Sequence, residues 1–103
     1  MATVIWTGNA KDDLKELSDY IGLENRVAAD RIVDRIYEHV RMLEKHPLSR
    51  QIVPDLEQFA YRQLVEPPCR IFYEVRRDKV YILHILRFEQ ILRLSRLEEG
   101  YSN

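Results

Sequence analysis

The feature that most constrains the fold is a pair of apolar segments, separated by a charged turn, between Cys69 and Arg87. The segments are residues 70–75 (RIFYEV) and 80–87 (VYILHILR), with Arg-Arg-Asp-Lys between them. β-Branched and aromatic residues dominate both segments, and the polar turn that separates them predicts a β-hairpin. Because both faces of this hairpin carry apolar side chains, the sheet that contains it needs cover on both sides.

Alternation of side chains along each strand divides the hairpin into two faces if Val75 lies opposite Val80. One face is almost entirely apolar and is expected to pack against helices: Ile71, Tyr73, Val75, Val80, Ile82, His84 and Leu86. The other face combines an apolar strip with two arginines and a carboxylate, and it is the candidate partner-binding surface: Arg70, Phe72, Glu74, Tyr81, Leu83, Ile85 and Arg87. A shift of one residue within a strand would exchange the two sets of that strand.

The mixed face has more than one interpretation. It is either a partner groove or an active-site floor, or it is a face that the chain's own C-terminal segment closes. The residues alone leave these alternatives open.

Two segments upstream of the hairpin have the apolar spacing of helices. After an apolar run at residues 4–6 with strand composition, a stripe over residues 10–21 predicts a first helix with Asn9 as its N-cap. Asn25 is expected to cap a second helix that runs to about Lys45, where a His-Pro pair ends it. The short connection between the two helices predicts an antiparallel helical hairpin.

The complete pattern predicts a single α+β domain over residues 1–103. Residues 60–65 form a further predicted strand, residues 48–58 a loop, and residues 89–97 an optional short helix before a disordered tail at 100–103. The element order is therefore β-α-α-β-β-β. It predicts an N-terminal strand and a helical hairpin packed on one face of a mainly antiparallel sheet.

Composition argues against several classes of function. The net charge of -1 lacks the basic excess of a protein whose main task is to grip nucleic acid. The single cysteine, Cys69, cannot form an internal disulfide, and neither a signal peptide nor a membrane-length apolar run is visible, so we expect a cytoplasmic protein with no membrane contact. The histidines lack ligand spacing, so neither a metal nor another cofactor is expected, and His84 is expected to be a hydrogen-bonded core histidine.

Metal-free RNA cleavage is the enzymatic alternative. It requires a base for the 2′-hydroxyl, cations for the developing charge and an acid for the leaving oxygen. The side chains that could supply them on the sheet are Arg62, Arg70, Arg87 and Tyr73, with Tyr81 as a further tyrosine. The simpler interpretation of these arginines is a solvated strand edge.

Several short motifs, taken in order, resemble the RelE/ParE superfamily of bacterial toxins. They are VIWT at 4–7, Asp13-Leu14, Tyr20-Ile21, Ala28-Ala29, RQLV at 62–65, RIFY at 70–73 and ILHIL at 82–86. The long helical hairpin with its Asp-Leu and Tyr-Ile pairs is most similar to the ParE branch.

The resemblance implies a toxin of a type II toxin–antitoxin module, of the kind linked to plasmid stabilisation, which a cognate antitoxin holds inactive in a hetero-oligomer. In this superfamily a segment of the antitoxin orders as it wraps the toxin, and the mixed face of the hairpin is the expected dock. ParE-like toxins inhibit DNA gyrase by binding it and are not enzymes. RelE-like toxins cut mRNA in the ribosomal A site.

The slightly acidic charge and the scarcity of lysine after Lys45 favour the gyrase branch, in which no catalytic residue is expected. The first alternative is a ribosome-dependent endoribonuclease that uses Arg62, Arg70, Arg87 and Tyr73. The second is a family member that has lost toxicity and only binds the antitoxin, because the segment after Leu86 departs from the family pattern.

Overall fold

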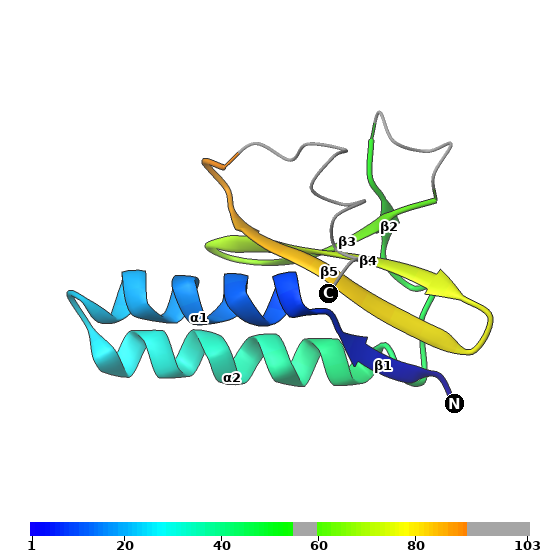
Figure 1. The fold of residues 1–103 in the computed structure, drawn as a ribbon, viewed down its shortest axis with the longest axis horizontal. Helices are drawn as coiled ribbons and strands as arrows, with labels where there is room; N and C mark the ends of the chain where they lie inside the picture. The colour runs from blue at the N-terminus through cyan, green and yellow to red at the C-terminus, as the bar shows by residue number, and fades with distance from the viewer. Residues whose placement is uncertain (55–59, 91–103) are drawn as a thin grey trace.

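The computed structural model describes residues 1–54 and 60–90, which form a layer of two helices beneath one face of a five-stranded sheet (Figure 1). The elements are β1 (Thr3–Trp6), α1 (Gly8–Gly22), α2 (Arg26–Met42), β2 (Gln51–Ile52), β3 (Arg62–Glu66), β4 (Cys69–Arg76) and β5 (Lys79–Arg87). This arrangement confirms the predicted α+β class and the helical hairpin.

The sheet has the order β1-β5-β4-β3-β2 and is antiparallel except at β1, which runs parallel to β5. Strand β2 lies inside the segment that was predicted as a loop. The sequence did not indicate this strand because two residues carry too little pattern. Of the optional helix at 89–97, residues 89 and 90 belong to a turn. The rest of that segment and the tail at 100–103 lie outside the described residues.

The helix caps are partly as predicted. The Asn25 side chain accepts a hydrogen bond from the Ala28 amide at 3.0 Å, as expected for an N-cap of α2. The N-cap of α1 is Thr7 rather than Asn9, because the Thr7 hydroxyl accepts from the Ala10 amide at 3.2 Å. Thr7 keeps the extended backbone of β1, so the helix begins directly after the strand.

Apolar clusters cover both faces of the sheet, as the composition of the hairpin requires. The larger cluster lies between the helices and the sheet and consists of Ala10, Leu14, Leu17, Ile36, Val40, Leu43, Leu64, Cys69, Ile71, Tyr73, Val80, Ile82 and Ile85. The smaller cluster lies on the outer face, away from the helices, and consists of Val53, Tyr61, Phe72, Leu83 and Leu86.

A β-bulge interrupts the pairing of β4 with β5. Val75 lies opposite Val80, as predicted, but further along the pair Phe72 lies opposite His84, so that Leu83 is an extra residue. An extra residue in one strand reverses the alternation of side chains beyond it.

The bulge makes the predicted faces wrong for the last four residues of the hairpin. Ile85 belongs to the core beneath the helices, and Arg87 pairs with Cys69 of that same core. His84 and Leu86 lie on the outer face instead. The sequence contains no glycine or proline at this point to indicate the irregularity.

Candidate functional site

The outer face of the sheet is not an open apolar strip. Phe72 and Leu83, at its centre, are completely buried, and Val53 and Tyr61 pack against them. The predicted partner-binding surface is therefore reduced to its margins.

Polar side chains occupy those margins. The Arg70 guanidinium lies 5.2 Å from the centre of the Phe72 ring and donates a hydrogen bond to the Gln90 carbonyl at 3.3 Å. Glu74 forms an ion pair with Arg76 at 2.8 Å, and the Arg76 guanidinium lies 6.0 Å from the Tyr81 ring. Arg70, Glu74 and Tyr81 stay half-buried and accessible to a partner.

Arg87 faces the turn of the helical hairpin rather than the outer strip. Its guanidinium lies 4.1 Å from the ring centre of Tyr20 on α1, and its Nε atom lies 3.0 Å from a Glu89 carboxylate oxygen. Tyr20, Leu23 and Val27 around this turn are 55%, 85% and 60% exposed. Arg87 and these three side chains form a surface that we term the hairpin tip.

The four candidate nuclease residues do not converge. Arg62 and Tyr73 are cross-strand partners on the helix side of the sheet. Arg70 lies on the outer face, and Arg87 lies at the end of β5, opposite Cys69 and four positions along β4 from Tyr73. No site that combines all four side chains can form in this arrangement.

The two residues that do meet already have structural partners. The Tyr73 hydroxyl donates to the Pro47 carbonyl at 3.1 Å, and burial raises the pKa of Tyr73 above its usual value of 10.0. The Arg62 guanidinium donates to the carbonyls of Arg50 at 2.6 Å and Leu48 at 3.3 Å. Both side chains hold the segment that follows α2 against the sheet.

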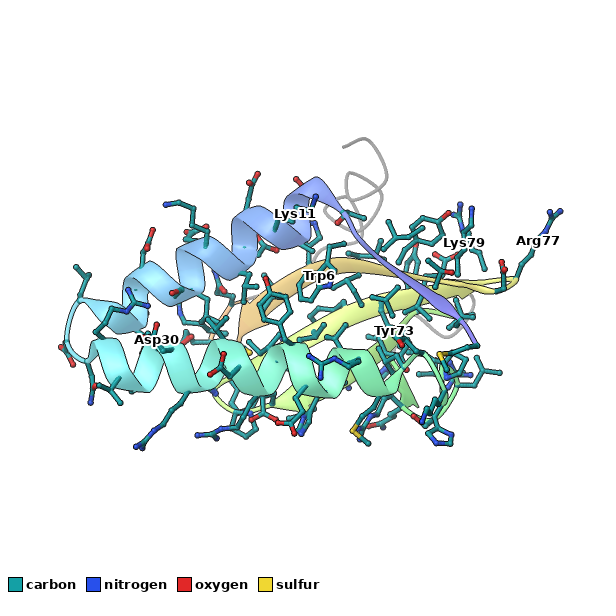
Figure 2. The ribbon with its side chains drawn as sticks, turned by 90° about the horizontal axis from the view of Figure 1, so that it is seen from below. Trp6, Lys11, Asp30, Tyr73, Arg77 and Lys79 are labelled. Atoms are coloured by element: carbon teal, nitrogen blue, oxygen red, sulfur yellow. The ribbon has the colours of Figure 1, made fainter. Side chains whose placement is uncertain are left out.

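A groove that the sequence did not indicate lies between the two helices. From the helix side, α1 and α2 diverge from their turn, and Trp6 of β1 lies in the gap (Figure 2). The ring centres of Trp6 and Tyr37 are 5.2 Å apart. The main hollow has a volume of about 410 Å³ and is lined by Trp6, Lys11, Leu14, Lys15, Ser18, Val33 and Tyr37.

The groove continues beyond the Trp6–Tyr37 pair. A second hollow of about 190 Å³ shares these two rings and adds Val4, Val40, Arg41 and Glu44. Val33 and Tyr37 stand four residues apart and so share one face of α2. This spacing is the only feature of the sequence that could have indicated the groove. The place of Trp6 beside them depends on the parallel pairing of β1 with β5, which sequence pattern does not indicate.

The groove has an apolar floor and a basic wall. The side chains of Lys11 and Lys15 stand on α1 at its rim and are exposed. Asp19 pairs with Lys15 at 2.9 Å and raises the pKa of Lys15 above its usual value through a hydrogen bond and its negative charge. Such a surface suits an acidic segment with apolar anchors.

Buried polar groups tie the helices to the sheet. His84 is buried, and its Nδ1 atom lies 2.6 Å from Asp13 of α1, which confirms a hydrogen-bonded core histidine. Glu66, which the sequence did not single out, is 5% exposed and lies 2.7 Å from His39 and 3.6 Å from Arg35 of α2.

The Cys69 thiol is a poor nucleophile. Burial, together with the nearby Glu66 charge, raises its pKa to about 12, so that the reactive thiolate is scarce at neutral pH. Within residues 1–54 and 60–90, no group of three or more His, Cys, Asp or Glu side chains is arranged to hold a metal ion. In the same ranges no helix is both long and apolar enough to cross a membrane.

Comparisons with known proteins agree with this fold. The model of the ParE toxin of type II toxin–antitoxin system, parDE, matches residues 4–92. The chain is 35% identical over 86 residues to Toxin RelE2 of Caulobacter vibrioides, covering 82% of this chain and 93% of the relative. A solved structure of the chromosomal ParDE TA system from P. aeruginosa aligns with a TM-score of 0.65 and 29% identity, covering 86% of this chain and 98% of the other.

Proposed function

Because the chain belongs to the ParE family of toxins from type II toxin–antitoxin systems, we propose that it inhibits DNA gyrase by binding it. Family membership implies a cognate antitoxin as its partner. The observation that carries the proposal of binding is the separation of Arg62, Arg70, Arg87 and Tyr73. Acid–base cleavage of RNA needs its groups within hydrogen-bonding reach of one phosphate. Arg70 lies on the opposite face of the sheet from Arg62 and Tyr73, and Arg87 lies four positions along β4 from Tyr73.

The hairpin tip is the surface that we assign to the target. Exposed aromatic and aliphatic side chains beside an arginine have the composition of protein-binding hot spots. Tyr20 and Leu23 project from α1 and its turn, and Arg87 adds the charge. Arg87 therefore stays in the proposed site, with helix residues as its neighbours instead of the outer strip.

The antitoxin is proposed to occupy the remaining accessible surfaces. On the outer face, Arg70, Glu74 and Tyr81 are the residues that a wrapping segment can reach, whereas Phe72 and Leu83 are buried and would only support it. Ile85 lies on the helix side of the sheet and drops out of this proposed dock. The groove between the helices is the second proposed dock, because its basic wall and apolar floor fit an acidic, partly apolar segment.

A ribosome-dependent endoribonuclease stays as the second candidate, because the curated relative bears the name RelE2. Its mechanism would need Arg62, Arg70, Arg87 and Tyr73 to approach one another. A change of register between β4 and β5 would not achieve this, since Arg70 and Tyr73 lie on opposite faces of the same strand.

The test compares two effects of the chain in one design. Expression without antitoxin is expected to cause filamentation and an SOS response, and purified protein is expected to inhibit supercoiling by gyrase. Rapid translation arrest with mRNA cut at codon positions, and normal supercoiling, would reject gyrase as the target. Normal growth at confirmed soluble expression would instead identify a family member without toxicity.

A further inference from the structure

The edge of β5 changes its partner halfway along the strand. Its first four residues pair with β1, up to Trp6 opposite Ile82. Beyond Ile82, α1 takes the place of a strand. The Thr7 hydroxyl donates to the Ile82 carbonyl at 2.7 Å, and the Thr7 amide donates to the same carbonyl at 3.2 Å.

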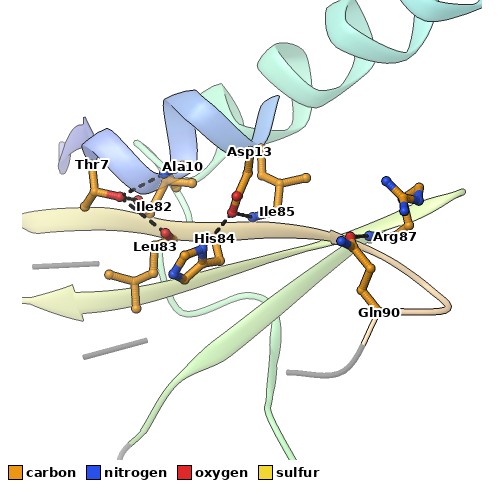
Figure 3. Close-up of polar contacts among 9 residues, drawn as sticks. All are labelled: Thr7, Ala10, Asp13, Ile82, Leu83, His84, Ile85, Arg87 and Gln90. Atoms are coloured by element: carbon orange, nitrogen blue, oxygen red, sulfur yellow. Dashed lines mark hydrogen bonds and ion pairs between the residues drawn. The ribbon is translucent and has the colours of Figure 1, made fainter. Parts of the chain in front are cut away.

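Asp13 supplies the next contacts along this edge. Its Oδ2 atom accepts a hydrogen bond from the Ile85 amide at 3.0 Å and lies 2.6 Å from His84 Nδ1, as Figure 3 shows. The Asp13 and His84 side chains are 10% and 2% exposed. A carboxylate with so little exposed surface loses stability when its hydrogen-bond donors move away, so it favours the arrangement that supplies both donors.

These contacts coincide with the bulge. Leu83 is the extra residue, and the two donors to Asp13 are the next two residues. With His84 on the outer face, the strand edge presents the Ile85 amide to α1, and Ile85 itself enters the core. In a regular register, Ile85 and Arg87 would lie on the outer face instead.

We propose that Asp13 is a positioning residue that holds β5 in its bulged register and so fixes the face on which Arg87 is presented. In this proposal Asp13 acts on Arg87 through its contacts with His84 and Ile85 of β5. The structural part of this proposal concerns the chain alone, and its consequence for gyrase rests on the proposed function.

The structural part is tested by NMR on the full chain. Asp13→Ala is expected to speed hydrogen exchange of the Ile85 amide at least about tenfold and to abolish the contact between Arg87 and the Tyr20 ring. Asp13→Asn is expected to retain both features. A single carboxylate oxygen of Asp13 accepts both hydrogen bonds, and the asparagine side chain still has one carbonyl oxygen that can do so. Asp12→Ala removes an exposed carboxylate from the same helical turn and is expected to change neither.

An intact Arg87–Tyr20 contact in folded Asp13→Ala would overturn the proposal. If that variant does not fold, Asp13→Ser replaces it, since a serine hydroxyl is too short to reach both partners. Asp13→Ser is then expected to lose the Arg87–Tyr20 contact and the protection of the Ile85 amide, and Asp13→Asn is expected to retain both.

The functional part of the proposal is tested by a double-mutant cycle that measures inhibition of supercoiling. Asp13→Ala and Arg87→Ala are each expected to weaken inhibition at least about tenfold, and the double variant by less than about threefold more than either. If Asp13→Ala inhibits supercoiling fully while Arg87→Ala inhibits it only weakly, the positioning role of Asp13 is overturned. Full inhibition by Arg87→Ala would reject Arg87 in the proposed function, while the NMR comparison still decides the role of Asp13.

Discussion

At the scale of single residues, Arg87 links the end of the sheet to the helical hairpin. Its side chain is 21% exposed and contacts Tyr20 and Glu89, so it contributes modestly to stability. We expect Arg87→Ala to abolish toxicity while the unfolding midpoint stays nearly unchanged. The measurement is growth after induction, with circular dichroism melting of the same variant, and full toxicity would remove Arg87 from the site.

A second residue-scale prediction concerns pH. The pKa of Cys69 rises from 9.0 in the unfolded chain to about 12 in the folded protein, mainly because of burial. The stability from this group is complete below pH 9 and is lost as pH rises toward 12, because the folded state retains the proton longer. Between pH 8 and 10.5, the free energy of unfolding should fall by about 1–2 kcal/mol from this group.

Urea unfolding at both pH values measures this fall, with Cys69→Ala as the comparison. The variant should lose less stability between the two pH values, although burial of Tyr73 acts in the same direction. Equal losses in the two proteins would show that Cys69 does not carry the effect.

At the scale of elements, β5 supplies several of the buried side chains in the core between the helices and the sheet. Ile82 is completely buried between the helices and the sheet, on the face that the sequence predicted. Ile82→Ala should lower the free energy of unfolding by about 2–5 kcal/mol, because it leaves a cavity in the core. Val65→Ala on β3, where the side chain is 51% exposed, is the matched control and should cost less than about 0.5 kcal/mol. An unchanged unfolding midpoint for Ile82→Ala would contradict this packing.

The elements also show where sequence pattern stops being informative. Apolar spacing predicted α1, α2 and the strands of the hairpin, because each forms from local periodicity. It failed at Leu83, since a bulge depends on contacts with Thr7 and Asp13, more than seventy positions away in the chain. The faces of Ile85 and Arg87 were therefore beyond prediction from β5 alone.

At the scale of the whole molecule, family resemblance predicted the function class, while the predicted partner-binding site stays a prediction. The motifs identified the toxin fold, but Phe72 and Leu83 at the centre of the predicted dock are completely buried and belong to one apolar cluster with Val53 and Tyr61. The open concavity is on the opposite side, where Trp6 meets Tyr37 between diverging helices. Its existence depends on how three elements meet, and no single segment of sequence carries that information.

The proposed assignment of the antitoxin to the groove and of gyrase to the hairpin tip predicts that neutralisation and target inhibition can be uncoupled. The double variant Lys11→Glu, Lys15→Glu reverses the basic wall of the groove and should weaken antitoxin binding at least about tenfold, because an acidic segment would then meet like charges. Its inhibition of gyrase should stay intact, since the hairpin tip is unchanged. Trp6 is the only tryptophan of the chain and lines the groove, so its fluorescence reports binding directly.

The matched control for this variant is Lys45→Glu, Lys79→Glu, which makes the same change in net charge at exposed positions outside the groove. This control should bind the antitoxin as the unmodified chain does. Arg87→Ala should show the reverse behaviour, with normal antitoxin binding and weak inhibition. If the groove variant and its control lose affinity equally, net charge rather than the groove governs antitoxin binding. If the groove variant also loses inhibition, the two surfaces are not independent.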